Sequence, residues 1–256
     1  MSGTEPGLFD AHFHIIDPRF PLVPNRGYLP DRYTCSDYRE RMKDFPLVGG
    51  AVVSGSFQAF DQDYLIDALA RLGPGFVGVT QLPVTTSDEE LLELDRAGVR
   101  AVRFNLKRGG SEHVEHLDRM ARRVHELAGW HVELYVDSRE LAGLNDQLSG
   151  LPAVSIDHLG LSREGLPELL RFAGSGGRVK ASGFGRVDFD VAGALEALYR
   201  ENPEALMFGS DLPSTRAARP YREADLDLIV ETLGDRAAQR VLHHNAARFY
   251  RLEGAG

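Results

Sequence analysis

Short apolar runs rich in β-branched residues recur along the chain, and segments with helical periodicity separate them. Such runs, bounded by glycine and polar turn residues, are typical of buried strands. The pattern predicts eight strands. They are expected at residues 8–14, 50–55, 76–82, 99–106, 132–136, 154–158, 179–183 and 206–211.

The segments between these runs carry the signals of helices. Residues 61–73 begin at an aspartate and end at a glycine, and residues 87–98 begin with Ser87 and Glu90, the spacing of a capping box. Further helical patterns cover residues 111–129, 165–174, 190–202, 225–234 and 236–252.

Strands that alternate with helices predict right-handed crossovers and a parallel sheet. Eight such units in 256 residues match the size of a (β/α)8 TIM barrel, so we expect an α/β fold with one domain over residues 1–256. A doubly wound open sheet is the alternative, but no glycine-rich phosphate loop follows the first strand. The proline-rich residues 15–46 are expected to form a long loop over the carboxyl ends of the strands, where TIM barrels carry their active sites.

Composition narrows the class of protein. A net charge of −9 argues against broad binding to nucleic acids or anionic membranes, so neither is an expected partner. Cys35 is the only cysteine, which excludes an intrachain disulfide and suits a reducing compartment. The sequence shows no signal-peptide pattern and no long apolar run, and a cytoplasmic protein is expected.

Polar residues gather where the predicted strands end. Asp10, His12 and His14 alternate with apolar residues in the first strand, so they are expected on one face, with Asp10 as a supporting partner. His158 ends the sixth strand and Asp211 the eighth. Imidazoles and a carboxylate at one rim of a barrel predict a metal site or an acid–base cluster.

Several motifs together resemble one family. "DAHFH", "VRFN", "WHVELYV", "IDHLG", "GSDLP" and "NAARFY" occur in an order that is similar to the amidohydrolase-related TIM-barrel hydrolases. Within that family the pattern is nearest to 2-pyrone-4,6-dicarboxylate lactonases and sugar-lactone hydrolases. The resemblance runs from Phe9 to Tyr250.

The resemblance implies catalytic roles for four residues. His12, His14 and His158 would hold a divalent metal or the substrate carbonyl, and Asp211 would activate water as general base. Relatives with two metals carry a lysine on strand four, where this chain has Arg103, and a histidine on strand five; His131 stands at the wrong end of that strand. Two possibilities therefore remain open. Either one zinc or manganese ion is bound by His12, His14, His158 and Asp211, or no metal is bound.

Substrate-binding residues are expected around the same rim. Guanidinium groups bind carboxylates with two parallel hydrogen bonds, and the candidates are Arg103, Arg108 and Arg186, joined by Ser54, Tyr135 and Tyr28 as lining residues. The chain departs from the dicarboxylate lactonases at two places. Leu161 stands where an arginine is expected, and residues 212–214 read Leu-Pro-Ser instead of Trp-Pro-His. A smaller lactone, with one carboxylate or several hydroxyl groups, is therefore at least as well supported.

These observations favour a hydrolase that opens a small anionic or polyhydroxylated lactone by water attack. The alternatives are a metal-dependent decarboxylase of the same superfamily and a barrel that binds a small ligand without catalysis. Lys180, within the seventh predicted strand, either pairs with a carboxylate in the barrel or takes part in catalysis. His113, His116 and His125 are expected on a solvated helix face.

Overall fold

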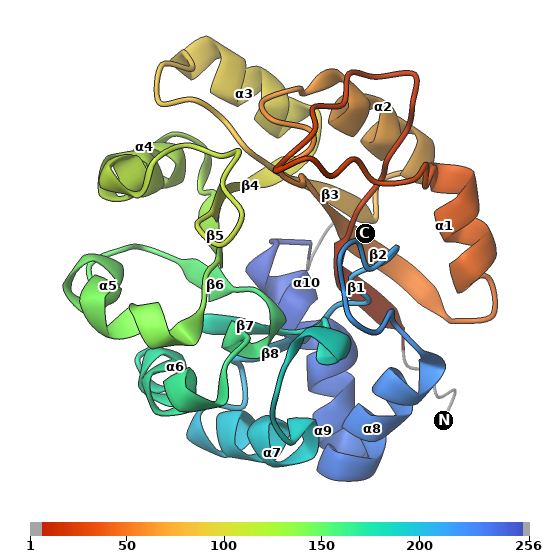
Figure 1. The fold of residues 1–256 in the computed structure, drawn as a ribbon, viewed down its shortest axis with the longest axis vertical. Helices are drawn as coiled ribbons and strands as arrows, with labels where there is room; N and C mark the ends of the chain where they lie inside the picture. Colours follow the sequence, from red (N-terminus) through yellow and green to blue (C-terminus); the bar gives the residue numbers. More distant parts are fainter. Residues whose placement is uncertain (1–6, 253–256) are drawn as a thin grey trace.

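The computed structural model describes residues 7–252, apart from the side chains of residues 145 and 146. Eight parallel strands, hydrogen-bonded in sequence order, form a nearly closed barrel surrounded by helices (Figure 1). The strands are β1 (Leu8–Phe13), β2 (Leu47–Val53), β3 (Phe76–Thr80), β4 (Val99–Asn105), β5 (His131–Tyr135), β6 (Val154–Ile156), β7 (Arg178–Ala181) and β8 (Leu206–Phe208). The predicted TIM barrel is confirmed.

The helices follow the strands in the expected alternation. They are α1 (Cys35–Met42), α2 (Asp63–Leu72), α3 (Asp88–Arg96), α4 (Leu117–Ala128), α5 (Leu141–Leu148), α6 (Leu166–Gly174), α7 (Val191–Glu201), α8 (Glu223–Leu233), α9 (Asp235–Gln239) and α10 (Asn245–Phe249). The Ser87–Glu90 capping box is present at the start of α3, and Gly129 ends α4 in a left-handed conformation. Within the described residues, no helix is long and apolar enough to cross a membrane.

Two helices are absent from the predicted set. α5 was not expected, and α1 lies inside the segment that we expected to be a loop. α1 begins with a capping box of Thr34 and Asp37, but charged residues dominate it and only Cys35, Tyr38 and Met42 are buried. Because its apolar stripe is so narrow, periodicity gave no helical signal there.

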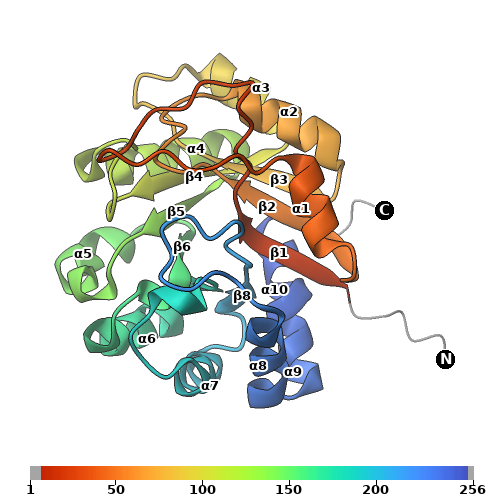
Figure 2. The ribbon, with the colours of Figure 1, turned by 45° about the vertical axis from the view of Figure 1, so that its right-hand side comes forward.

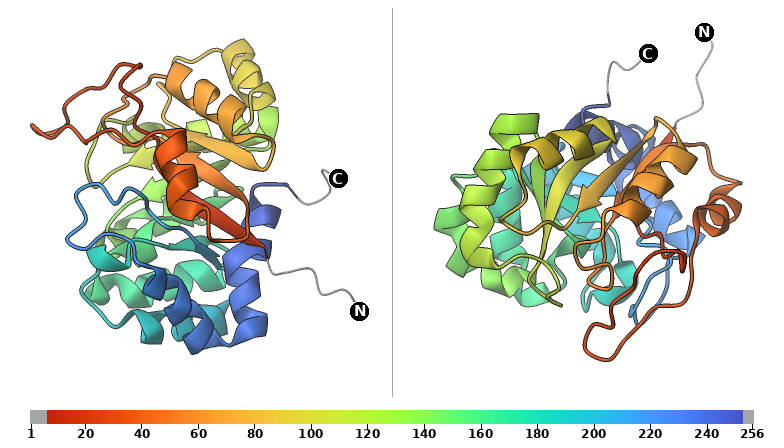
Figure 3. Two further views of the ribbon diagram at one scale, coloured as in Figure 1. Left: turned by 90° about the vertical axis from the view of Figure 1, so that its right-hand side faces the viewer. Right: turned by 90° about the horizontal axis from the view of Figure 1, so that it is seen from above.

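The part of that segment before α1 lies against the loops that follow β2 and β4 (Figure 2). The backbone of Val23 donates a hydrogen bond to Phe57, in the loop after β2, and the side chain of Asn25 donates one to the carbonyl oxygen of Arg108, after β4. The segments that follow β1 and β8 lie on the same side of the molecule (Figure 3). They form the rim of the candidate site.

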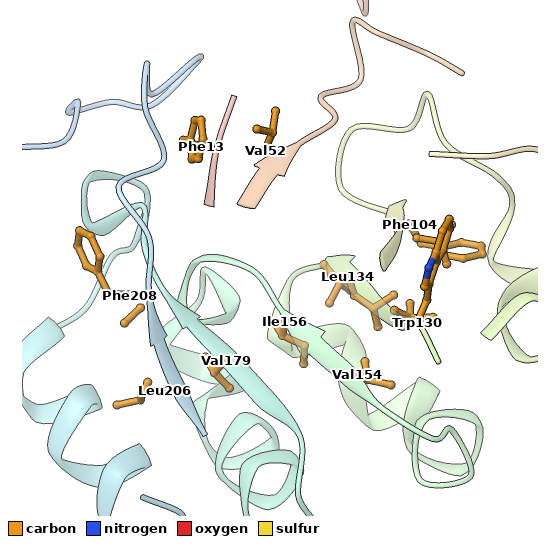
Figure 4. Packing of buried hydrophobic residues seen from close by; sticks show 14 of the residues in the cluster. Phe13, Val52, Phe104, Trp130, Leu134, Val154, Ile156, Val179, Leu206 and Phe208 are labelled. Atoms are coloured by element: carbon orange, nitrogen blue, oxygen red, sulfur yellow. The ribbon is translucent and has the colours of Figure 1, made fainter. Parts of the chain in front are cut away.

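Apolar packing holds the barrel in two layers. The outer layer lies between strands and helices, and Figure 4 shows Trp130 and side chains of seven strands in it. The inner layer is formed by Phe9, Ala11, Ala51, Val53, Val77, Val79, Ala101, Met207, Ala246 and Tyr250. These inner residues come from β1 to β4, β8, α10 and Tyr250 just after it, so the apolar part of the interior lies on one side of the barrel.

Candidate active site

A β-bulge in β1 decides which of its polar residues face the interior. Asp10 pairs with Gly50 of β2 and Phe13 with Val52, so three steps along β1 match two along β2. The extra residue turns the following side chains to the other face. The prediction that Asp10 shares a face with His12 was therefore wrong.

Asp10 instead joins β1 to β8 from outside the barrel interior. Its carboxylate accepts hydrogen bonds from the backbone and hydroxyl of Ser210 at 2.8 and 2.6 Å, from Tyr38 at 3.1 Å and from the backbone of His12 at 3.2 Å. Burial raises the pKa of Asp10 to about 6 in spite of these bonds. Asp10 is thus a supporting partner that fixes the backbone on which His12 stands.

The main chains of β1 and β8 also meet at the site. The backbone of Asp211 donates to the carbonyl oxygen of His12 at 2.7 Å, and the backbone of His14 donates to that of Leu212 at 2.7 Å. Gly209 permits this approach, because a Cβ atom there would lie 2.7 Å from the Cβ atom of His12.

We therefore expect Gly209→Ala to lower the free energy of unfolding by about 1–3 kcal/mol, as overpacking does in tight interiors. Urea denaturation measures this change. Gly143→Ala in α5 is the matched control, because a Cβ atom at that position meets nothing within 4 Å. Equal stability of the two variants would contradict the close packing of β8 against His12.

Three imidazole rings converge on one carboxylate oxygen. The Nε2 atoms of His12, His14 and His158 lie 4.0, 3.8 and 3.8 Å from Oδ1 of Asp211. Neither the Nε2 atom of His12 nor this Oδ1 atom has a hydrogen-bond partner among residues 7–252, although both are buried. The structure thus brings together the four residues that the sequence marked as catalytic candidates.

The Nδ1 atom of each ring, on the side away from Asp211, contacts a different group. Nδ1 of His14 donates to the carbonyl oxygen of Val53 at 2.7 Å, and Nδ1 of His158 lies 2.9 Å from the hydroxyl of Ser182. Nδ1 of His12 has two neighbours at 3.3 Å, the ammonium of Lys180 and a carboxylate oxygen of Asp157. Such contacts fix both the orientation and the tautomer of a ring.

The protonation states at the site follow from burial and charge. Burial lowers the pKa of His12 to about 3 and the pKa of His158 well below its usual value, so both rings are neutral near pH 7. Burial alone would raise the pKa of Asp211, but Arg186 and the three surrounding histidines together outweigh it and hold that pKa below the usual range. Nε of Arg186 donates to Oδ2 of Asp211 at 2.6 Å, and Asp211 is therefore a carboxylate with one free oxygen.

His158 and Asp211 stand on unusual backbone. Their φ angles are +52° and +60°, in the left-handed region that side chains with a Cβ atom seldom adopt. His158 comes two residues after the end of β6 and Asp211 three residues after the end of β8, and these turns bring the two side chains together. Strain of this kind concentrates at functional sites.

Charged residues fill the interior on the β4–β7 side. Arg103 donates to Oδ2 of Asp157 at 3.2 and 2.7 Å and to the carbonyl oxygen of Ser54 at 2.8 Å. Lys180 forms a buried ion pair with Glu133, which also accepts a hydrogen bond from Tyr250. Of the two roles left open for Lys180, pairing with a barrel carboxylate is what the structure shows.

A cavity that is open to solvent lies next to His14 and His158. Seven of the residues singled out from the sequence line it, namely Tyr28, Arg103, Arg108, Tyr135, Arg186, His14 and His158. Ser54 does not line it, since its hydroxyl is buried against Tyr64 at 2.5 Å. The sequence reading did not include Ser56, Asn105, Thr215 and Arg216, which also line this cavity.

The four arginines that line the cavity differ in whether a carboxylate neutralises their charge. Arg103 and Arg186 are paired with Asp157 and Asp211, whereas no carboxylate among residues 7–252 lies within ion-pair distance of Arg108 or Arg216. Burial and the nearby charge of Arg108 lower the pKa of Arg216. The mouth of the cavity thus has uncompensated positive charge.

Arg216 is held in place by the long first loop. It donates to the side-chain and backbone oxygens of Asn25 and lies over the ring of Tyr28, with 4.3 Å between the guanidinium carbon and the ring centroid. No pattern in the sequence brings residue 216 to Asn25, because the contact joins the loops after β1 and β8.

The donor set of the histidine cluster fits a divalent metal. Ligand atoms of His12, His158 and Asp211 lie within 4.8 Å of one another, and two of these residues offer unpartnered buried atoms. Neutral imidazoles with a carboxylate are the ligands of zinc sites. A second group of His12, Glu133 and Asp157 also meets this distance, but the ammonium of Lys180 lies among these residues.

Two further polar residues of β5 and the loop after it, His131 and Asp137, do not line the cavity. His131 is at the N-terminal end of β5 as expected, 3.1 Å from Glu133 and against the ring of Phe249. Asp137, just after β5, is paired with Lys107 and Arg139 at 3.0 and 2.8 Å. These groups stabilise the scaffold and do not face the histidine cluster.

A match to the amidohydrolase family model covers residues 9–252, and the chain belongs to this family. It is an enzyme of the amidohydrolase superfamily. It is 29% identical to 4-sulfomuconolactone hydrolase of Rhizobium radiobacter over 95% of this chain and 90% of that one. It is 26% identical to D-galactarolactone isomerase of Agrobacterium fabrum over 98% of this chain and 96% of that one.

A third relative matches over a shorter region. 2-Pyrone-4,6-dicarboxylate hydrolase of Comamonas testosteroni is 32% identical over 60% of this chain, which spans about half of the length of that enzyme. Among solved structures, an Agrobacterium tumefaciens protein superposes with a TM-score of 0.85 at 22% identity, covering 96% of both chains, which supports the fold. The curated relatives are thus hydrolases and an isomerase of lactones.

Proposed function

We propose that the protein hydrolyses a small lactone that carries an anionic group. The observation that carries this proposal is the convergence of three imidazole Nε2 atoms on the free oxygen of Asp211. Two of these histidines, His14 and His158, line a cavity together with arginines. A cyclic ester needs a polarised carbonyl, a base for the attacking water and an acid for the departing oxygen. The histidine cluster and Asp211 offer groups for all three.

In the proposed reaction, the oxygen of a water molecule forms a bond to the lactone carbonyl carbon while Oδ1 of Asp211 takes one proton from that water. Negative charge develops on the carbonyl oxygen, where an imidazole N–H group stabilises it by a hydrogen bond. The ring C–O bond then breaks, and the proton on Asp211 passes to the departing oxygen. One water is consumed, and the product is a hydroxy acid or its keto form.

A metal would be held by His12, His158 and Asp211, with His14 alongside. When bound, such an ion polarises a carbonyl oxygen and makes a bound water more acidic. Arg186 has the same role whether or not a metal is bound. Arg186 keeps Asp211 ionised and occupies its second oxygen, so that only Oδ1 faces the three rings.

The anionic group of the substrate is placed at the mouth. Arg108 and Arg216 line the cavity without a carboxylate partner, and an anion would supply one. Two relatives act on lactones whose names include an acid group, a sulfonate in one and two carboxylates in the other. Their substrates fit a cavity with this charge.

We expect Arg216→Met to raise KM for an anionic lactone about 10- to 100-fold with little change in kcat, because a charged hydrogen bond of ~1.5–3 kcal/mol is lost away from the reacting carbonyl. Steady-state kinetics measure both constants. Arg219→Met is the matched control, since Arg219 comes from the same loop but is paired with Asp225. A KM that stays the same in Arg216→Met would place the anion elsewhere.

The function itself is tested by following acid release at constant pH with a panel of anionic and neutral lactones. Anionic lactones that the enzyme opens at least tenfold more efficiently than neutral ones would support the proposal. Tight binding of lactones without any turnover would instead support a non-catalytic barrel.

A further inference from the structure

The ammonium of Lys180 lies inside the barrel, directly below the histidine cluster, and the proposed reaction does not use it. Lys180 is completely buried. Its Nζ atom contacts Glu133, lies 3.3 Å from Nδ1 of His12 and 3.7 Å from Oδ1 of Asp157. An ammonium has three N–H donors and no acceptor, so in any of these contacts that is a hydrogen bond, Lys180 is the donor.

Nδ1 of His12 can therefore satisfy only one of its two neighbours. If Nδ1 accepts from Lys180, it must offer a lone pair; if it donates to Asp157, it must carry the proton. The contact with Lys180 has hydrogen-bond geometry, whereas Oδ1 of Asp157, 3.3 Å from Nδ1 of His12, has no hydrogen-bond partner in the described part of the chain. A neutral imidazole has one N–H group, so a lone pair at Nδ1 places the proton at Nε2.

His14 is held in the opposite way. Its Nδ1 atom lies 2.7 Å from the carbonyl oxygen of Val53, which can only accept. In the neutral ring, Nδ1 then carries the proton, and Nε2 has a lone pair. The two histidines of the H-x-H pair, whose ring centroids are 5.1 Å apart, thus present different groups to Asp211.

We propose that Lys180 is a positioning residue that fixes His12 as the Nε2–H tautomer. His12 can then donate a hydrogen bond to the substrate carbonyl oxygen, whereas Nε2 of His14 can only accept a hydrogen bond. The catalytic half of this assignment rests on the proposed function; the tautomers do not. An Nε2–H group has no lone pair for a metal. Lys180 therefore also opposes metal binding at His12, because coordination would require the proton to move to Nδ1 and the contact with Lys180 to break.

The test compares wild type with Lys180→Met and with Lys180→Met combined with Glu133→Gln, which removes the buried pair together and protects folding. The full-length protein is labelled with ¹⁵N-histidine, and His12→Gln identifies the His12 signals. Wild type is expected to show a protonated Nε2 and an unprotonated Nδ1. In the lysine variants, Nδ1 is expected to donate to Asp157, which reverses the pattern.

Tyr250→Phe is the matched control. Tyr250 contacts the same Glu133 carboxylate but lies away from Nδ1 of His12, so its loss perturbs the buried network without removing the donor. The His12 pattern is expected to stay as in wild type. A protonated Nδ1 in wild type, or the same pattern in every variant that folds, would overturn the proposal.

A second readout uses zinc alone, in competition with a chromophoric chelator. The lysine variants are expected to bind zinc at least tenfold more tightly than wild type, and Tyr250→Phe to bind it like wild type. Equal zinc affinities in all variants would overturn the proposal. Both readouts are free of substrate, so a failure to find lactone turnover would count against the proposed function and leave the tautomer assignment to be judged by its own data.

Discussion

Asp211→Asn is expected to lower kcat by about 10³-fold, within the range that a general base contributes. An amide has nearly the shape of a carboxylate but cannot take a proton from water. Among residues 7–252, Asp211 is the carboxylate that lies within 4.0 Å of all three imidazole Nε2 atoms. A fall in kcat of this size, with a far-UV circular dichroism spectrum like that of wild type, would show that the variant is folded and that the chemical step is slowed.

The matched control for this substitution is Asp225→Asn. Asp225 follows β8 as Asp211 does and also pairs with an arginine, but its partner Arg219 does not line the cavity next to His14 and His158. The control is expected to keep kcat within about twofold, because Asp225 pairs with Arg219 and not with a residue of the histidine cluster. Activity of Asp211→Asn within tenfold of wild type would remove Asp211 from the role of base.

The largest effect on stability is expected from Asp157→Ala, with a loss of about 3–5 kcal/mol in the free energy of unfolding. Asp157 is fully buried and accepts two hydrogen bonds from Arg103, while Lys180 lies 3.7 Å away. Alanine leaves the guanidinium inside the barrel without its counter-charge. Chemical denaturation at pH 7 measures the loss.

Asp118→Ala is the control, because Asp118 forms an ion pair of the same type with Arg122 on the outside of α4. Both side chains are about half exposed, at 49% and 47%. Exposed pairs at this spacing contribute ~0.3–0.5 kcal/mol. A loss in Asp157→Ala as small as in the control would show that the buried charges in the barrel are not mutually dependent.

The fold could be predicted from the sequence because each unit carries its own signal. Strand and helix periodicities alternate, and glycines or capping residues mark most boundaries, so the order of elements alone implies a parallel barrel. Helix α1 escaped this reading because it buries a narrow stripe of three residues. The ends of the predicted strands marked the four residues that meet at the site, and the family resemblance then implied their catalytic roles.

The geometry of the site depended on information that the sequence does not carry locally. A bulge in β1 sends Asp10 to one face and His12 to the other, and no residue type marks its position. Arg216 reaches the cavity through a contact with Asn25, 191 residues earlier in the chain. Asp157, Glu133 and Lys180 form one buried network only because β5, β6 and β7 are neighbours in the barrel.

The central claim is that water opens the lactone, and the incorporation of ¹⁸O tests it most directly. A lactone that the enzyme consumes is incubated in H₂¹⁸O, and the product is analysed by mass spectrometry at early times. The account predicts a ring-opened acid that carries one ¹⁸O atom in its new carboxyl group. A product of unchanged mass, as an isomerase forms, or release of CO₂, as a decarboxylase gives, would contradict it.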